Sequence, residues 1–249
     1  LGESGSGKTT LLSLICGFLN PLSGSISING STINKLSSKT KDEHRADNIG
    51  IIFQQFNLLP YANVVDNIVL PLYFSKVRSA NVTNQRESAL NLCKQLRLPD
   101  DIDQYKASSL SVGQQQRVAV ARALIGNPSL VIADEPTTAL DVLVQKEIID
   151  LLKELQKQTQ MSVLFISHDL SLVSQLADKI IVHYEGRVVE SGTPQEIIKQ
   201  PKDNYTKALI HARPSPNQRL KKLPTIENYS TPLVKNQFID PKAVSYTHL

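Results

Sequence analysis

Short apolar runs alternate with longer amphipathic stretches along most of the chain. The runs at 49–52, 130–135 and 162–167 are apolar at nearly every position, which is typical of strands buried on both faces of a parallel sheet. The segment between the last two places Val144, Ile148 and Leu152 at helical spacing. Strands that alternate with helices predict a parallel sheet covered on both faces.

Two segments predict further strands of a different kind. Residues 24–30 alternate polar and apolar positions and end in Asn29-Gly30, a hairpin signal. Residues 179–184 turn at Glu185-Gly186 into 187–191. By contrast, 59–124 contains no strong strand run. The pattern therefore predicts an α/β fold with a mixed or parallel sheet and an inserted helical subdomain at about 59–125.

The first residues carry the clearest chemical motif. Gly2-Glu3-Ser4-Gly5-Ser6-Gly7-Lys8-Thr9 fits the pattern G-x-x-x-x-G-K-[ST] of phosphate-binding loops. In such a loop the backbone N–H groups cradle phosphates, the lysine reaches the outer phosphates and the threonine holds Mg²⁺. Read alone, the segment could be a Gly/Ser-rich turn that enters a helix. The motif predicts ATP and Mg²⁺ as ligands, and nucleotide-binding residues Gly2, Ser4, Gly5, Ser6, Gly7, Lys8, Thr9 and Thr10.

Asp134 and Glu135 close the apolar run at 130–135. A buried parallel strand delivers its last side chains to the carboxyl edge of the sheet. Two adjacent acids there could also belong to a solvated turn. With Lys8 and Thr9 present, we predict that Asp134 helps to place Mg²⁺ and that Glu135 is the catalytic base.

Residues 110–124 predict a capped amphipathic helix. Ser111 is a suitable N-cap residue, and the apolar side chains of Val118, Ala121 and Leu124 recur at helical spacing. The stretch Leu110-Ser111-Val112-Gly113-Gln114 also resembles the signature segment of ATP-binding cassette (ABC) ATPases. The resemblance implies that Ser111, Gly113 and Gln114 contact the γ-phosphate of ATP bound to a second subunit. Val112 departs from the commonest pattern, which has glycine there.

Three further segments resemble elements of the same family, in the same order. Phe53-Gln54-Gln55 resembles the Q-loop, which implies a contact of Gln54 with Mg²⁺ and with the transport partner. Residues 136–141 resemble the D-loop. Phe165-Ile166-Ser167-His168-Asp169 resembles the switch segment, which implies a catalytic role for His168. The resemblance covers about residues 1–212.

The resemblance implies a P-loop NTPase cassette that hydrolyses ATP to power a membrane transporter. Its implied partners are a second ABC subunit, as homodimer or heterodimer, transmembrane permease subunits and a solute-binding protein. Its implied location is the cytoplasmic face of the membrane.

Composition and charge agree with this interpretation. The chain has 249 residues, 41% of them apolar, and no run approaches 18 apolar residues. The two cysteines, Cys16 and Cys93, are too few for a disulfide framework. The net charge of +4 comes from 213–249, which hold six basic and two acidic residues. The cassette is therefore neutral, and we predict no nucleic-acid partner.

The two ends of the chain stand apart from the pattern. The sequence begins at Leu1, inside the phosphate-binding element, so we expect a fragment that lacks the strand feeding the loop and the aromatic residue that stacks on adenine. Residues 213–249 carry five of the thirteen prolines, which predicts an extended, Pro-rich basic tail. Residues 243–249 resemble translated adaptor sequence.

The two halves resemble different subfamilies. Residues 53–68 are similar to cassettes of lipoprotein-release and macrolide-efflux transporters. Residues 192–216, with Gly192-Thr193-Pro194 and Asn204-Tyr205-Thr206, are similar to oligopeptide and dipeptide uptake ATPases. Peptide uptake is favoured and export is the alternative. The sequence leaves open the substrate, the direction, and whether the chain is a natural mosaic or a spliced assembly.

Three other functions compete with transport. A soluble ABC ATPase of DNA repair or translation would bring tandem cassettes, coiled-coil inserts or basic surfaces. A switch GTPase would need an acid that reads guanine, which Asn34-Lys35-Leu36-Ser37 lacks. A cassette that only mediates interactions would not need Lys8, Asp134, Glu135 and His168 together.

Overall fold

A three-stranded parallel sheet forms the centre of the molecule. The computed structural model describes residues 1–2, 5–136 and 142–211. Its central strands are β3 (Ile49–Ile52), β4 (Leu130–Asp134) and β5 (Ser162–Ile166), in the order β3-β4-β5. Ile132 of β4 pairs with both neighbours and is fully buried. The predicted α/β class and the three central strands are confirmed.

Two antiparallel hairpins accompany this sheet. β6 (Ile180–Tyr184) and β7 (Arg187–Gly192) pair through the turn at Glu185-Gly186, where both residues have positive φ. β1 (Ser27–Ile28) and β2 (Ser31–Thr32) form a shorter hairpin. Asn29 and Gly30 occupy left-handed conformations in its turn, as the Asn-Gly signal predicts. The first of these strands is much shorter than the predicted 24–30.

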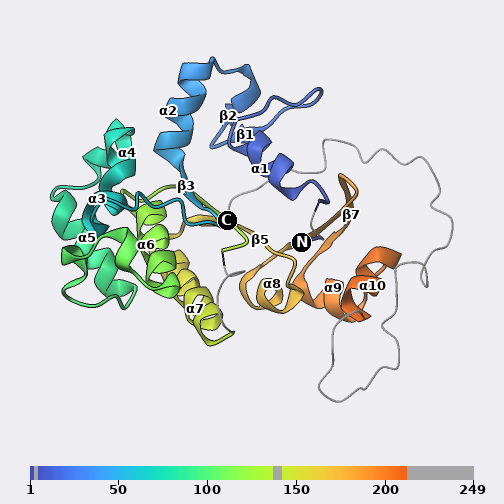
Figure 1. Cartoon of the computed structure of the whole chain (residues 1–249). Helices are drawn as coiled ribbons and strands as arrows, with labels where there is room; N and C mark the ends of the chain where they lie inside the picture. The colour runs from blue at the N-terminus through green and yellow to red at the C-terminus, as the bar shows by residue number, and fades with distance from the viewer. Residues whose placement is uncertain (3–4, 137–141, 212–249) are drawn as a thin grey trace.

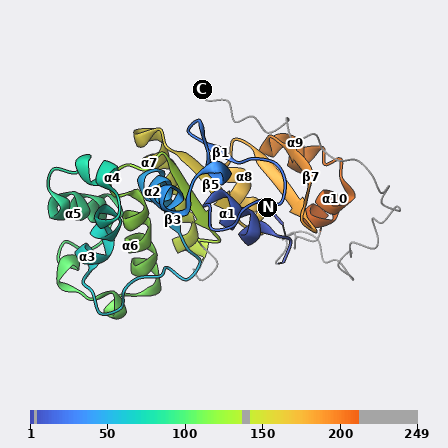
Figure 2. The ribbon, with the colours of Figure 1, turned by 90° about the horizontal axis from the view of Figure 1, so that it is seen from above.

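A helical lobe packs beside the sheet, as the sequence predicts for 59–125. It consists of α3 (Val64–Val69), α4 (Lys76–Ala80), α5 (Gln85–Gln95) and α6 (Val112–Leu124), joined by 3-10 turns. Figures 1 and 2 show these helices gathered at one end of the molecule, with β6, β7 and the last helices at the other. Buried Arg78 of α4 donates to the carbonyl oxygens of Ala123 and Ile125 at the end of α6, and also to that of Ile49 in β3, which joins the lobe to the sheet.

The remaining helices flank the strands. They are α1 (Lys8–Ile15), α2 (Ser38–Asn48), α7 (Val142–Thr159), α8 (Leu170–Leu176), α9 (Pro194–Lys199) and α10 (Asn204–His211). α1 begins at Lys8, inside the phosphate-loop motif. The sequence pattern did not predict α2, because this helix buries none of its side chains and so has no apolar stripe. Its start is marked by Ser37, whose side chain accepts from the N–H of Thr40.

A gap separates the central sheet from the β6–β7 hairpin. Within the described residues, β5 and β6 are not paired with each other, and a cavity of about 630 Å³ lies between them. Leu1 lies beside this cavity on the β6 side: its N–H₃⁺ group donates to the carbonyl oxygen of Ile181, and its own carbonyl accepts from His183 N–H. These two bonds form a one-residue parallel bridge to β6. The chain therefore enters the phosphate loop from a position between the two sheets.

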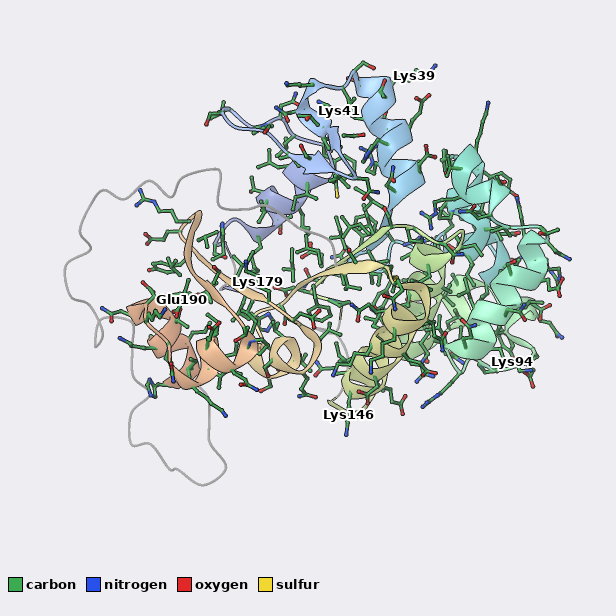
Figure 3. The ribbon with its side chains drawn as sticks, turned by 180° about the vertical axis from the view of Figure 1, so that it is seen from behind. Lys39, Lys41, Lys94, Lys146, Lys179 and Glu190 are labelled. Carbon is green, nitrogen blue, oxygen red and sulfur yellow. The ribbon has the colours of Figure 1, made fainter. Side chains whose placement is uncertain are left out.

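Lysine side chains are spread over separate elements, with Lys39, Lys94 and Lys146 exposed and Lys41 half-buried. Figure 3 shows Lys39 and Lys41 on α2, Lys94 on α5 and Lys146 on α7 at different edges of the molecule. Among the described helices, none combines the length and the apolar character that a membrane crossing requires.

Candidate functional site

The N-terminus of α1 offers a phosphate-sized anion site. Gly7 is its N-cap, with φ +96°, and no side chain caps the helix. The first turn contains no acidic residue, so its N–H groups and the positive end of the helix dipole are open to an anion. Gly5 has φ +81°, a conformation that also favours glycine. The described residues 5–9 of the predicted loop therefore have a backbone shape that suits phosphate binding.

Lys8 is held within this loop. Its side chain is only 8% exposed, and its Nζ donates to the carbonyl oxygen of Gly2 at 2.7 Å. Thr9 and Thr10 are exposed at the start of α1. Lys8 thus closes the loop on itself and keeps its ammonium group near the α1 N-terminus. Ser4 lies outside the described residues.

The end of β4 brings two carboxylates to the same region. Glu135 has positive φ, +44°, and its N–H donates to the carbonyl oxygen of Ile166 at 3.0 Å. This bond turns the chain out of the sheet directly after Asp134. The Nδ1 atom of His168, which follows β5, lies 3.3 Å from Oε1 of Glu135. The predicted base and the predicted switch histidine are therefore neighbours.

Electrostatics connect these carboxylates to the loop. Burial raises the pKa of Asp134 above its ordinary value of 3.8, the charge of Glu135 raises it further, and the charge of Lys8 acts in the opposite direction. The influence of the Lys8 charge on the pKa of Asp134 places the phosphate loop and the end of β4 near each other, as one candidate site. Four of the predicted residues, Lys8, Asp134, Glu135 and His168, converge there.

The donor set fits Mg²⁺ bound together with a nucleotide. The hydroxyl of Thr9 and the carboxylate of Asp134 are hard oxygen donors, which Mg²⁺ prefers. Among the described residues, no group of three His, Cys, Asp or Glu side chains could hold a metal ion. Mg²⁺ commonly takes only one or two protein ligands and completes its shell with waters and phosphate oxygens. The residues present fit that mode.

The signature residues lie elsewhere. α6 starts after Ser111, whose Oγ accepts from Gln114 N–H at 3.3 Å while Gln114 Oε1 accepts from Ser111 N–H at 2.9 Å. This reciprocal pair is a capping box, and it confirms Ser111 as the N-cap. Figures 1 and 2 place α6 in the helical lobe, apart from α1. Ser111 is exposed, and Gly113 faces Val144 of α7.

Gln54 is exposed directly after β3. Within the described part of the chain, no hydrogen bond joins it to Thr9 or Asp134. The next residues, Phe56 and Asn57, both have positive φ, and Arg122 of α6 donates to their carbonyl oxygens. The segment after Gln54 is thus attached to the signature helix. The D-loop prediction for 136–141 lies outside the described residues except for Pro136.

Two residues that contact this region were not predicted from the sequence. One is Arg122, which no motif singled out. The other is His183, whose imidazole lies against the backbone of Gly7. Arg122 donates to the carbonyl oxygens of Phe56 and Asn57, and His183 contacts the backbone of Gly7. Each residue is far from its partner in the sequence, so only folding brings the partners together.

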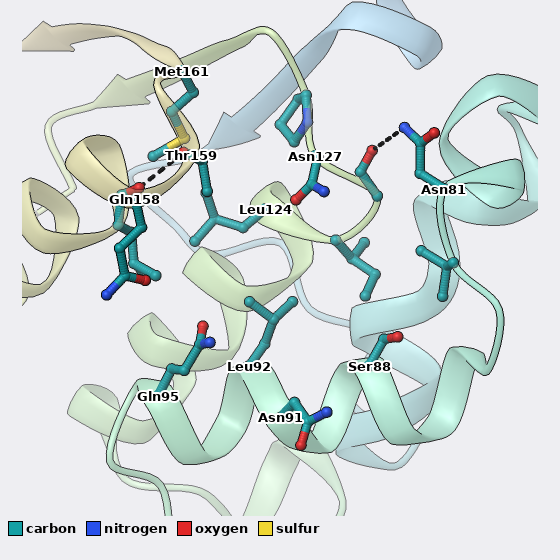
Figure 4. A pocket seen from close by; sticks show the side chains of 15 residues that line it. Asn81, Ser88, Asn91, Leu92, Gln95, Leu124, Asn127, Gln158, Thr159 and Met161 are labelled. Atoms are coloured by element: carbon teal, nitrogen blue, oxygen red, sulfur yellow. Dashed lines mark hydrogen bonds between the residues drawn. The ribbon is translucent and has the colours of Figure 1, made fainter.

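A second cavity lies away from this site. It has a volume of about 250 Å³ and opens where α4, α5, α6 and the end of α7 meet. Figure 4 shows the uncharged side chains of Asn81, Asn91, Asn127 and Gln158 around it, together with Leu92 and Leu124. It contains none of the predicted site residues, so it is no part of the phosphate site.

Two family models match this chain. The model of the ABC transporter family matches residues 1–138. The model described as the oligopeptide/dipeptide transporter C-terminal region matches residues 189–237.

Curated relatives agree with these matches. The oligopeptide transport ATP-binding protein OppF of Haemophilus influenzae is 39% identical over 230 residues, which cover 91% of this chain and 68% of that protein. The methionine import ATP-binding protein MetN of Lactobacillus johnsonii is 37% identical, over 84% of this chain and 60% of that protein. The chain therefore spans between three fifths and about two thirds of these two relatives.

Solved structures give the same result for the fold. The dimeric ATP-binding cassette MJ0796, in a post-hydrolysis state bound to ADP and Pi, has a TM-score of 0.70 at 38% identity and covers 78% of this chain and 83% of its own. CbiO1 from Clostridium perfringens, part of the ABC transporter complex cbiONQ, has a TM-score of 0.69 at 31% identity and covers 80% and 78%.

Proposed function

Because this chain belongs to the ABC transporter family and is an ATPase of that family, we propose that it powers the uptake of peptides through partner membrane subunits. The observation that favours peptides is the match of residues 189–237 to the oligopeptide/dipeptide transporter C-terminal region. The similarity to OppF supports the same cargo.

The proposed chemistry is electrostatic. Lys8 and the N–H groups at the start of α1 bind the phosphates, and they are already positioned before ATP arrives. Thr9, Asp134 and Gln54 would hold Mg²⁺, and the bound ion would supply positive charge beside the phosphates. Preorganised positive groups of this kind stabilise the negative charge that develops on the transferred phosphoryl group.

Glu135 is the proposed general base. It stands one residue beyond Asp134, and its carboxylate contacts the imidazole of His168. Glu135 accepts a proton from the attacking water, while His168 orients the carboxylate and stabilises charge on the γ-phosphoryl group. The 3.3 Å contact between these two side chains supports the assignment.

The proposed site is completed across a dimer. Ser111, Gly113 and Gln114 lie in the lobe apart from α1, so within one chain they do not reach the phosphates that Lys8 binds. A second cassette would supply these groups to the γ-phosphate. The dimeric state of the MJ0796 cassette supports this arrangement. The permease subunits, a solute-binding protein and a position at the cytoplasmic face of the membrane belong to the same proposal.

A second candidate cargo comes from other relatives. MetN proteins, named for methionine import, and ProV of Escherichia coli, named for glycine betaine and proline betaine transport, are 34–37% identical to this chain. Export, as in lipoprotein-release or macrolide systems, is the alternative direction that residues 53–68 leave open.

The test is cargo-dependent ATP hydrolysis by the assembled transporter. The chain would be combined with its permease subunits in vesicles, and ATP hydrolysis measured with an oligopeptide, methionine or glycine betaine and the matching solute-binding protein. Stimulation by the oligopeptide alone is expected. Stimulation by methionine or betaine instead would replace the proposed cargo, and a Lys8→Ala chain provides the inactive control.

A further inference from the structure

The turn of the β6–β7 hairpin packs against the phosphate loop. Gly186 N–H donates to the carbonyl oxygen of Ser6 at 3.0 Å, and His183 N–H donates to that of Leu1 at 2.7 Å. A Cβ atom on Gly2 would lie 2.2 Å from the carbonyl oxygen of His183. The described ends of the loop therefore rest on the short segment 183–186.

The imidazole of His183 reaches the most important residue of the loop. A Cβ atom on Gly7 would lie 3.2 Å from Cε1 of His183 and 3.9 Å from its Nδ1. Gly7 is the N-cap of α1, where the phosphate-binding N–H groups begin. The ring thus fills the space directly against the backbone that must stay in place for ATP to bind.

Two buried polar atoms at this contact have no hydrogen-bond partner within the described part of the chain. They are Nδ1 of His183 and Oγ of Ser6. Burying a polar group without a hydrogen-bond partner costs free energy, and an apolar side chain would fill the same space without that cost. A polar ring here therefore needs a reason beyond packing, and the adjacent nucleotide site provides one.

We propose that His183 is a positioning residue of the nucleotide site, whose neutral imidazole holds Ser6 and Gly7 in the conformation that receives the phosphates of ATP. This inference rests on the proposed function, because it presumes that the loop binds ATP. His183 touches the loop and acts on the nucleotide through it. No part of the proposed reaction assigns it a role.

The charges around the ring favour its neutral form. Burial lowers the pKa of His183 below its ordinary value of 6.5; the nearby Ser6 backbone opposes this effect, and the positive charges of the Leu1 ammonium and Lys8 add to it. On the same hairpin, Glu185 and Arg187 are exposed. A protonated imidazole would either keep its positive charge buried near Lys8 or move away from Gly7. Either outcome would weaken the contact between His183 and the phosphate loop.

Two variants separate packing from titration. His183→Ala removes the ring and leaves a void against Gly7, whereas His183→Met fills a similar volume and cannot titrate. At about pH 7.5 we expect His183→Ala to raise the KM for ATP about tenfold with kcat changed less than about threefold, since a small misplacement of a binding group is costly. His183→Met should restore most of the affinity. His44→Ala, on α2, is the control.

The pH dependence provides the second measurement. Between about pH 7.5 and 5.5 the Kd for Mg-ATP of the original chain, divided by that of His183→Met, should rise about threefold or more, because only the original chain protonates beneath the loop. Dividing the two constants removes the protonation of ATP itself. Without nucleotide, the melting temperature of the original chain should fall over the same pH range, whereas that of His183→Met should not show this fall.

The results that overturn the inference are distinct from failure of the proposed function. An unchanged KM in His183→Ala refutes the positioning role. Should that variant fail to fold, a constant Kd ratio between the original chain and His183→Met across this pH range refutes it equally. Absence of any ATP binding by the original chain would instead refute the proposed function.

Discussion

Two helix N-termini in this molecule are both predicted to contact phosphate, yet they are built in opposite ways. α1 begins at Gly7 with no side-chain cap, so its first N–H groups have no competing acceptor from a capping residue. α6 begins at Ser111 with a complete capping box formed with Gln114. One terminus is open and the other is closed by its own side chains.

This difference separates their proposed tasks. The open terminus, with Lys8 held beside it, can bind phosphate without rearrangement, which suits a site that captures ATP first. At the closed terminus, Ser111 Oγ is engaged by Gln114 N–H at 3.3 Å, a long bond that a charged acceptor can replace. The signature helix is therefore stable on its own, and under the proposed mechanism it would exchange a local bond for a contact with phosphate when two cassettes meet.

The largest expected effect comes from the carboxylate beside the open terminus. Glu135→Gln retains a side chain that can contact His168 but cannot accept a proton from water. We expect ATP hydrolysis to fall by about 10²-fold or more while ATP still binds, and an ATP-bound dimer to accumulate. Steady-state hydrolysis and gel filtration with ATP would measure both effects. Turnover near that of the exposed control variant Glu154→Gln would refute Glu135 as the base.

The sequence predicted the open terminus better than its surroundings. The glycines, Lys8 and Thr9 form a local pattern whose spacing alone dictates the loop. The apolar runs of β3, β4 and β5 were equally clear, since a buried strand has no polar face. α2 escaped prediction because its stability comes from caps and from ion pairs such as Arg45 with Asp42, which leave no apolar period. His183 escaped because its role depends on a contact 176 residues from Gly7 in the sequence.

A mixture of two inactive chains tests whether the two termini share one site. Lys8→Ala damages the open terminus, and Ser111→Arg places a bulky side chain at the closed one. A mixed dimer concentrates both lesions in one composite site and leaves the other intact. If one intact site turns over alone, an equal mixture should recover about a quarter of the original activity, since half of the dimers are mixed and each has one working site.

The measurement is ATP hydrolysis against the mixing ratio. Neither variant should hydrolyse ATP alone. Normal hydrolysis by Ser111→Arg by itself, at every protein concentration, would show that the two termini do not act together.

Substitutions at Ser111 can separate its capping role from its proposed contact with phosphate. Ser111→Ala removes the cap and should lower the free energy of unfolding by about 1 kcal/mol. Ser111→Asp preserves a good cap and stability, but its carboxylate repels the γ-phosphate, so hydrolysis should fall about tenfold. Urea unfolding and ATP hydrolysis, measured on both variants, distinguish the two roles. Equal ATP hydrolysis by Ser111→Asp and the original chain would show that Ser111 acts only as a helix cap.

The smallest expected effect is a gain of stability beside the open terminus. The pKa of Asp134 is raised in the folded chain, chiefly by burial. A carboxyl group with a raised folded-state pKa makes the protein more stable below that pKa, and this contribution is lost as pH rises through it. At pH 7 the ionised group therefore carries a cost, which Asp134→Asn removes. Partial exposure keeps the gain small, so we expect the melting temperature at pH 7 to rise by about 1–3 °C.

The same variant should lose most of the added stability that Mg²⁺ gives with ATP, because the amide is a weak Mg²⁺ ligand. The gain should vanish below about pH 4, where the original carboxyl group is itself protonated. A melting temperature that falls at pH 7, or a gain that persists in acid, would show that the ionised form of Asp134 stabilises the fold.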